Sequence, residues 1–172
     1  WSEYADKYLF VGHTEWREPI QEKLNDPSPE LGIGLIAEYS ETTSQIDMRA
    51  SIKILQDVGS ELRLTVLIME DSIIDDQKDT RLDQTEFPGF RNPDYVHRHV
   101  MRAQVNGADG LTGKIIVPSS GIAADEWIDW THSYIVPTSI LDIHHCAIIA
   151  FITNSTTGEI VQVEESHVNF VD

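Results

Sequence analysis

Seven histidines and one cysteine are the residues of this 172-residue chain best suited to bind a metal ion or act as a nucleophile. His97 and His99 are two positions apart, so on one β-strand both side chains would point to the same face and could chelate a metal. A structural zinc ion needs four ligands, and no partner with motif spacing accompanies this pair. The remaining candidates are His132, His144, His145 and His167. Packing of two half-buried histidines explains the pair more simply, and we predict no metal site.

Cys146 follows two histidines in the sequence His144-His145-Cys146. On a strand, His144 and Cys146 would face the same side, which suggests a thiol with a base. A reactive thiolate needs an accessible, electropositive setting. Cys146 instead opens the apolar run CAIIAFIT, which is typical of an inert core cysteine.

The acidic stretch Glu70–Phe90 lacks apolar alternation and predicts a long surface loop. Its aspartates are Asp71, Asp75, Asp76, Asp79 and Asp83. Calcium requires six to eight oxygen ligands, and this spacing does not match an EF-hand. A solvated charged loop is the default interpretation, and a non-standard calcium site within residues 70–86 stays open.

Two further patterns predict structure rather than chemistry. Ser119, Ser120 and Gly121 in VPSSG lack the G-x-S-x-G arrangement and predict a turn. Glu164 and Glu165 are adjacent, so on a strand they point to opposite faces and cannot act as a pair.

No motif combines a nucleophile, a base and oxyanion donors. We therefore predict no enzyme activity, no catalytic residues and no bound cofactor.

Trp127 and Trp130 lie three positions apart in DEWIDW, on opposite faces of a predicted strand. Trp130 is expected in the core and Trp127 at the surface. With Asp125, Glu126 and Asp129 beside it, Trp127 could contact a sugar or a protein. A tryptophan that only covers the edge of the fold is the simpler alternative.

Apolar residues recur with a period of two along most of the chain, which predicts antiparallel strands. About eight strands are expected, beginning near residue 33 and including 45–55, 61–68, 95–105, 112–117, 126–136, 144–153 and 159–171. The first two of these ranges are joined by a glycine-containing turn and predict a hairpin. Asn106–Gly110 predicts a further turn. The fold class is therefore mainly β, with a sandwich or barrel architecture.

The first 25 residues follow a helical period, because Trp16, Ile20 and Leu24 recur every four positions. We predict that residues 1–25 form a helical appendage or the tail of a preceding domain, and that residues 26–172 form the β-domain. The chain begins at Trp1 without a signal-like stretch, which suggests a fragment of a longer precursor.

The net charge of −17 argues against binding to nucleic acid or to anionic membrane surfaces, because both would repel the chain. A single cysteine excludes an internal disulfide. No apolar run approaches the roughly 20 residues that a membrane-spanning helix needs.

Three segments together carry a family resemblance: TVLIMEDSIIDDQ, YVHRHVMRAQVNGADG and CAIIAFITNSTTGEIVQVEES. From Trp16 to its end the chain resembles the Omp-twenty-eight type of outer-membrane lipoproteins of Bacteroidetes. The resemblance implies a C-terminal β domain with an immunoglobulin-like antiparallel β-sandwich at the outer membrane or cell surface. It also implies membrane attachment only through a lipid anchor outside this stretch.

These observations predict a non-catalytic interaction module, an adhesin or receptor, that binds a host or bacterial macromolecule. Glu70–Phe90 and Asn106–Gly110 are the predicted contact regions, because long loops on a rigid scaffold often bind partners. The alternative is a divalent-metal-dependent or carbohydrate-binding accessory domain of an enzyme or nutrient-uptake system.

Overall fold

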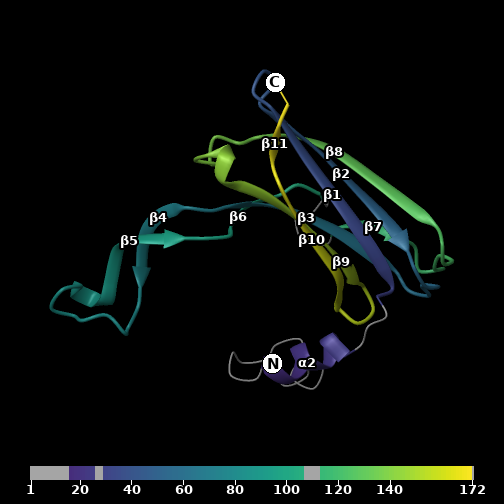
Figure 1. Cartoon of the computed structure of the whole chain (residues 1–172), viewed down its shortest axis with the longest axis horizontal. Helices are drawn as coiled ribbons and strands as arrows, with labels where there is room; N and C mark the ends of the chain where they lie inside the picture. The colour runs from purple at the N-terminus through teal and green to yellow at the C-terminus, as the bar shows by residue number, and fades with distance from the viewer. Residues whose placement is uncertain (1–15, 26–28, 107–112, 172) are drawn as a thin grey trace.

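A computed structural model describes residues 16–25, 29–106 and 113–171 of the chain. Within these ranges the protein is mainly β (Figure 1). The elements are α2 (Arg17–Asn25), β1 (Leu31–Ser40), β2 (Gln45–Ile54), β3 (Leu62–Glu70), β4 (Ile73–Lys78), η1 (Pro88–Phe90), β5 (Arg91–His97), β6 (Val100–Gln104), β7 (Lys114–Val117), β8 (Trp127–Ile135), η2 (Ile143–His145), β9 (Cys146–Asn154), β10 (Ile160–His167) and β11 (Asn169–Phe170). The helix in these ranges is too short to cross a membrane.

Three sheets organise the strands. One has the order β11-β1-β2-β8, and a second has the order β10-β9-β3-β6 with β7 also paired to β3. The third consists of β4 and β5 alone. Strand β11 runs parallel to β1, and the other pairings are antiparallel. The first two sheets form the body of the molecule, and the third extends away from it (Figure 1).

The body has one hydrophobic core to which both large sheets contribute. Alternate residues of β2 are buried, as the sequence predicts: Ile46, Met48, Ala50, Ile52 and Ile54. From β3 the core receives Leu62, Leu64, Val66 and Ile68. This confirms the predicted core faces of both strands, since the period-two pattern coincides with burial.

Strand β9 lies between β10 and β3 and supplies the predicted apolar run. Ile148, Ala150 and Ile152 are fully buried, and Ala147 on the opposite face is 7% exposed. The prediction of a central strand is therefore confirmed.

The predicted hairpin between the second and third strands is wrong. Strand β2 pairs with β1 and β8, whereas β3 pairs with β6, β7 and β9 in the other sheet. The chain between them is joined to the body by the isolated bridge between Val58 and Ile122. The two strands belong to different sheets, and each buries one face in the core that the sheets share. Alternation identifies the buried face but not the neighbouring strand.

Three predicted boundaries also need correction. The range 95–105 is not one strand, because the chain breaks at Arg98 and His99 between β5 and β6. The range 159–171 divides into β10 and β11, which belong to different sheets. Glu70–Phe90 is not all loop, since it holds the end of β3 and the whole of β4.

The N-terminal helix α2 is short, and the apolar stripe predicted for it is exposed. Trp16, Ile20 and Leu24 are 55%, 55% and 72% exposed. Residues 1–15 and 26–28, which belong to the predicted appendage and its junction, lie outside the described ranges.

Candidate functional site

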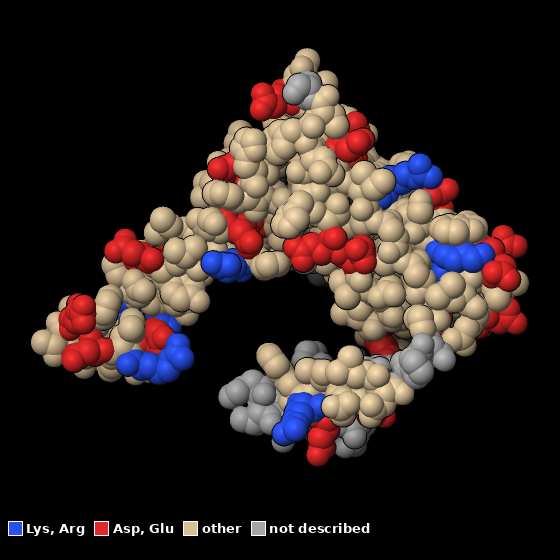
Figure 2. Space-filling view, viewed as in Figure 1, with Lys and Arg blue, Asp and Glu red and all other residues tan. Residues whose placement is uncertain are grey.

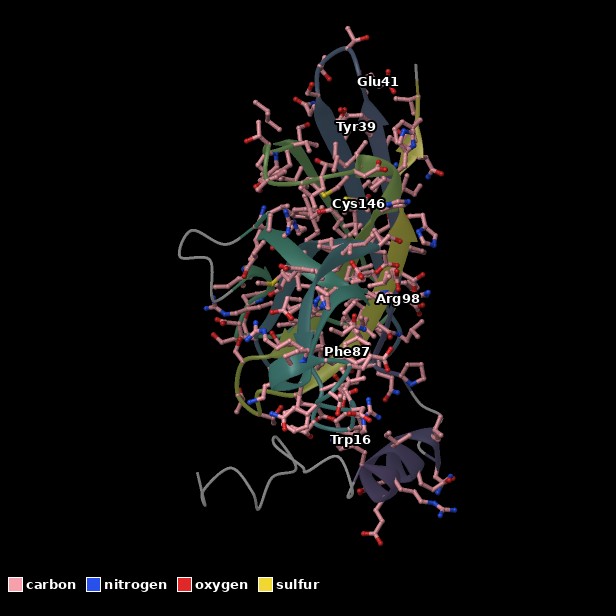
Figure 3. All side chains as sticks on the ribbon, turned by 90° about the vertical axis from the view of Figure 1, so that its left-hand side faces the viewer. Trp16, Tyr39, Glu41, Phe87, Arg98 and Cys146 are labelled. Atoms are coloured by element: carbon pink, nitrogen blue, oxygen red, sulfur yellow. The ribbon has the colours of Figure 1, made fainter. Side chains whose placement is uncertain are left out.

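The most prominent surface feature is a projection that we call the arm, residues 72–98. It comprises the two-stranded sheet of β4 and β5 and the connecting tip, residues 79–90. Figure 1 shows the arm reaching away from both large sheets, and Figure 2 shows acidic and basic side chains together along it. In Figure 3 the arm points toward the reader, with Phe87 and Arg98 on it.

Apolar side chains are exposed along the arm. Ile74 and Val96 lie directly opposite each other in the register and are 67% and 46% exposed. Tyr95 is 43% exposed, and its ring contacts His97 edge to face with 4.8 Å between centroids. Exposed apolar and aromatic side chains on a projecting element are available for contact with another macromolecule.

Polar contacts fix the base of the arm. Ser72, the first residue of the arm, and His99, the residue after its end, adopt left-handed backbone conformations with φ of 62° and 50°. Asp71 accepts a hydrogen bond of 2.5 Å from the His99 amide. The His99 ring lies between two carboxylates, 3.3 Å from Asp71 and 3.4 Å from Glu165.

This geometry separates the two histidines that the sequence suggested as a chelating pair. His97 ends β5 within the arm, whereas His99 lies at the break before β6 and has a left-handed backbone. A shared strand face, which the spacing suggested, is therefore wrong. The left-handed turn breaks the period of two at His99.

A buried ion pair lies directly behind the arm base. The Glu70 side chain is fully buried, and its Oε1 accepts hydrogen bonds from the amides of Leu141 and Asp142 at 2.8 and 2.6 Å. Its Oε2 lies 3.0 Å from Arg102 Nε, forming an ion pair without an aligned hydrogen bond. This pair joins β3, β6 and the chain before η2 at the point where the arm leaves the body.

The tip is ordered by its own hydrogen bonds. Asp79 forms a fork with the Arg81 guanidinium and accepts from the Arg81 amide. The Arg81 side chain, followed by its amide, lowers the pKa of Asp79 to about 2. Asp83 accepts from the Thr85 amide, which lowers the pKa of that carboxyl. These local contacts give the tip a defined shape without burial.

Beside the tip lies an open depression of about 490 Å³. Its lining combines apolar rings with a charged pair: Asp76, Glu86, Phe87, Pro88, Arg91 and Pro93. Arg91 forms an ion pair with Asp76, and this contact raises the pKa of Arg91. The depression therefore combines a paired guanidinium with a phenyl ring near the end of the arm.

The aspartates considered for calcium each have a separate partner. Asp76 pairs with Arg91, and Asp79 with Arg81. Asp75 accepts from the amide of Asp76. Across the described ranges no three histidine, cysteine or acidic side chains gather in a metal-binding group. The structure therefore does not bring the predicted acids together.

Cys146 lies in the core, as the sequence predicts, at 2% exposure. Burial, followed by the charges of Glu70 and Asp142, raises the pKa of its thiol to about 12. His144 and His145 belong to η2 before the strand, so the predicted strand face shared by His144 and Cys146 is wrong. His144 instead stacks on Phe170, with 4.2 Å between ring centroids.

The two tryptophans lie as predicted on opposite faces of β8. Trp130 is 5% exposed in the core, and Trp127 is 64% exposed. The Lys53 ammonium lies 5.4 Å from the centre of the Trp127 ring. Cross-strand partners Lys53 and Trp127 therefore meet on the outer face of the body.

The remaining sequence candidates occupy structural positions. Ser119 and Ser120 form the predicted turn, and the Gly121 amide donates to the Pro118 carbonyl at 2.9 Å. A Cβ at Gly121 would lie 2.3 Å from the Val58 carbonyl oxygen, so a side chain there would clash. Glu164 and Glu165 are adjacent on β10, as predicted.

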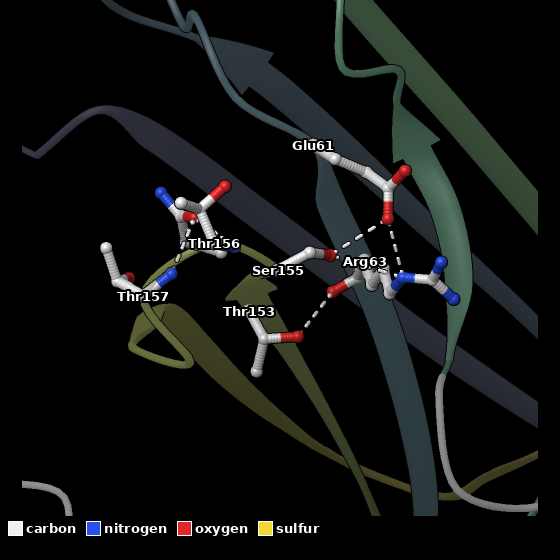
Figure 4. A network of polar contacts seen from close by, with 7 residues as sticks. Glu61, Arg63, Thr153, Ser155, Thr156 and Thr157 are labelled. Atoms are coloured by element: carbon white, nitrogen blue, oxygen red, sulfur yellow. Dashed lines mark hydrogen bonds and ion pairs between the residues drawn. The ribbon is translucent and has the colours of Figure 1, made fainter. Parts of the chain in front are cut away.

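A polar network covers the outer face of β3 and β9 at the end far from the arm (Figure 4). Glu61 accepts from the Arg63 guanidinium at 2.8 Å and from the Ser155 hydroxyl at 3.0 Å. Ser155, followed by Arg63, lowers the pKa of Glu61. The polar groups of these side chains form hydrogen bonds with one another, so we infer that the network stabilises the turn after β9.

Two structural contacts of the body have no signal in the sequence analysis. The buried pair of Glu70 and Arg102 had no recognisable spacing, because β3 and β6 are joined through the whole arm. Asn106 was assigned to a turn, and the rest of that turn lies outside the described ranges. Its side chain accepts from the Val66 amide and donates to the Leu64 carbonyl, both at 2.8 Å, and so extends the pairing of β3.

Comparisons with known proteins agree with this architecture. The family model described as outer membrane protein Omp28 matches residues 7–171. A crystal structure of a domain of the outer membrane lipoprotein Omp28 from Porphyromonas gingivalis is 19% identical, with a TM-score of 0.50, and the match covers 85% of this chain and 93% of that one. The sporulation control protein Spo0M from Bacillus subtilis is 10% identical, with a TM-score of 0.51 over 84% of this chain and 51% of that one. A search of curated proteins gave no match.

Proposed function

The chain belongs to the Omp28 family of outer membrane proteins, and on that premise we propose that it is a non-catalytic interaction module, an adhesin or receptor, that contacts a macromolecule through the arm. The protein is located in the outer membrane, as its family is. The proposal includes a lipid anchor in the full-length protein and an immunoglobulin-like sandwich as the type of the two-sheet body.

The observation that carries the proposal is the exposure of Ile74 and Val96 on a projecting, locally ordered hairpin. Ile74 and Val96 are cross-strand neighbours and together form a continuous apolar surface, and continuous exposed apolar surface is typical of contact sites. The polar contacts at the base of the arm lie next to this pair and hold it in place before a partner binds, which reduces the entropy lost on binding.

The test compares two matched double variants in one adhesion assay. Ile74→Ala with Val96→Ala removes the apolar pair of the arm. Ile160→Ala with Val163→Ala removes two exposed apolar residues of β10, which are 56% and 53% exposed. The probes are immobilised fibronectin, laminin and collagen, together with intact bacterial cells.

We expect the arm variant to lose at least ten-fold in binding to one of these surfaces, while the β10 variant binds like the original chain. Both variants should keep the melting temperature, because exposed truncations rarely change stability. Equal binding by the arm variant and the original chain on every surface would contradict the proposal.

A further inference from the structure

A second surface, on the outer face of β1, β2 and β8, has a different chemistry from the arm. We call it the β8 platform. Cross-strand register places its outward side chains in five rows of three. From one end to the other the rows are Gly32-Lys53-Trp127, Gly34-Ser51-Asp129, Ile36-Arg49-Thr131, Glu38-Asp47-Ser133 and Ser40-Gln45-Ile135.

Two carboxylates of the platform are each held by two donors on one oxygen. Asp129 Oδ1 accepts from the Ser51 hydroxyl at 2.6 Å and from Arg49 at 3.2 Å, and these contacts lower the pKa of Asp129. Asp47 Oδ1 accepts from the Ser133 hydroxyl at 2.5 Å and from Gln45 at 2.8 Å. In each case the fixed donors orient the carboxylate while its second oxygen has no hydrogen-bond partner among the described residues.

The surface between these carboxylates is hollowed. A shallow depression of about 560 Å³ is lined in part by Ile36, Glu38, Arg49 and Thr131. At the Trp127 end of the platform, a Cβ added at Gly32 would meet nothing within 4 Å, so the glycine leaves open space beside Lys53, its partner in the register. Asp47 and Asp129 lie about 13 Å apart along the strands, because each residue advances a strand by roughly 3.3 Å. An extended ligand could therefore contact both.

The charges of the platform select the class of ligand. Arg49 is paired with Asp129, and Lys53 with Asp125 at 3.0 Å. Both cations of the platform are thus paired with carboxylates among the described residues, so a sulfated or otherwise anionic ligand would have to compete with those carboxylates for them. Asp129 is likewise occupied by Arg49, and Arg49 lies two residues from Asp47 on the same face of β2, which reduces the attraction of this face for a polycation. A neutral ligand with many hydroxyl groups suits this surface, since each hydroxyl both donates and accepts hydrogen bonds.

Trp127 completes this set of contacts. Its ring is 64% exposed at one end of the platform, and an exposed indole provides a flat apolar face beside polar groups. We propose that the β8 platform binds a neutral, linear oligosaccharide, with Trp127 against the apolar face of a sugar ring and Asp47 and Asp129 accepting hydrogen bonds from sugar hydroxyls. This site is separate from the arm and goes beyond the function proposed above.

The test is affinity electrophoresis of the full chain in native gels that contain barley β-glucan, xyloglucan, galactomannan or dextran. At least one of these neutral polysaccharides should retard the protein. Trp127→Ala should weaken the apparent affinity at least ten-fold, and Asp129→Asn should weaken it less. The matched control is Trp16→Ala, which removes another exposed tryptophan, 55% exposed just before α2 and outside the platform, and should leave retardation unchanged.

Two further probes test whether the platform binds a charged ligand instead of a neutral polysaccharide. Heparin-agarose tests an anionic ligand, and titration with polylysine tests a basic partner. Binding confined to either probe overturns the proposal, as does the absence of retardation in all four neutral gels or equal retardation of the Trp127→Ala variant. A chain whose arm is replaced by a linker should still be retarded, so failure of the arm proposal and failure of this one give different results.

Discussion

The body and the arm reach order by different means. In the body, β2, β3 and β9 each bury a row of aliphatic side chains in one core. In the arm, no residue of β4 or β5 is buried, and the structure describes both strands completely. An isolated two-stranded hairpin is marginally stable in water. The arm therefore depends on the polar contacts at its base and tip, whereas the body depends on burial.

Stability and exposed apolar surface are therefore separated in this molecule. Apolar residues of the body stabilise the fold because water is excluded from them. The apolar residues Ile74, Tyr95 and Val96 of the arm are exposed and therefore contribute little to the stability of the fold. The buried pair of Glu70 and Arg102 lies where the two regions meet.

The largest effect is expected at that junction. Arg102→Ala leaves the Glu70 carboxylate buried without its counter-charge, which should cost about 3 kcal/mol or more in the free energy of unfolding. Urea unfolding measures the change. The matched control is Arg91→Ala in the arm, whose exposed ion pair with Asp76 should contribute less than about 1 kcal/mol. Equal losses in the free energy of unfolding from the two variants would show that the Glu70–Arg102 pair contributes no more than an exposed ion pair.

A pair of identical truncations compares the two regions directly. Ile148→Ala removes a fully buried side chain of β9 and should cost about 2–5 kcal/mol. Ile74→Ala removes a side chain of the arm that is 67% exposed, and it should change stability by less than about 0.5 kcal/mol. Both values come from the same denaturant titration. A substantial loss for Ile74→Ala would mean that the arm packs against the rest of the fold.

The smallest effect concerns the tip. Arg81 lowers the pKa of Asp79 from 3.8 to about 2. The folded-state pKa is below the ordinary one, so the contact contributes fully above pH 3.8 and is lost as the pH falls toward 2. The Arg81 amide resonance in NMR spectra should titrate with a midpoint near 2. In Arg81→Gln this midpoint should rise toward 3.8, and an unchanged midpoint would contradict the assigned cause.

The sequence predicted those parts of the fold in which one face is buried. The alternation of Ile46 to Ile54 and the opposite placement of Trp127 and Trp130 follow from the period of a strand in contact with a core. Strand pairing was not predictable in the same way. Two half-buried strands show the same alternation of apolar and polar residues whether they are neighbours in one sheet or belong to different sheets. Strands β2 and β3 belong to different sheets.

The arm was predicted only as an acidic surface region, and its strands were missed. A strand exposed on both faces has no reason to alternate, so Ile73 and Ile74 are adjacent and acids follow them. The register that places Ile74 opposite Val96 depends on pairing across the tip. The platform on the body was found in part, since Trp127 was expected at the surface, but the alignment of Asp47 with Ser133 needs the strand register.

Replacing residues 73–97 by a short glycine-serine linker tests the separation of the two regions most directly. Adhesion to fibronectin, laminin, collagen and intact bacterial cells would be measured for this variant and for the original chain, at a temperature where circular dichroism shows both folded. We expect the variant to unfold cooperatively with little change in melting temperature and to lose adhesion to the surface that the original chain binds. A folded variant that adheres as strongly as the original chain would contradict the assignment of the contact surface to the arm.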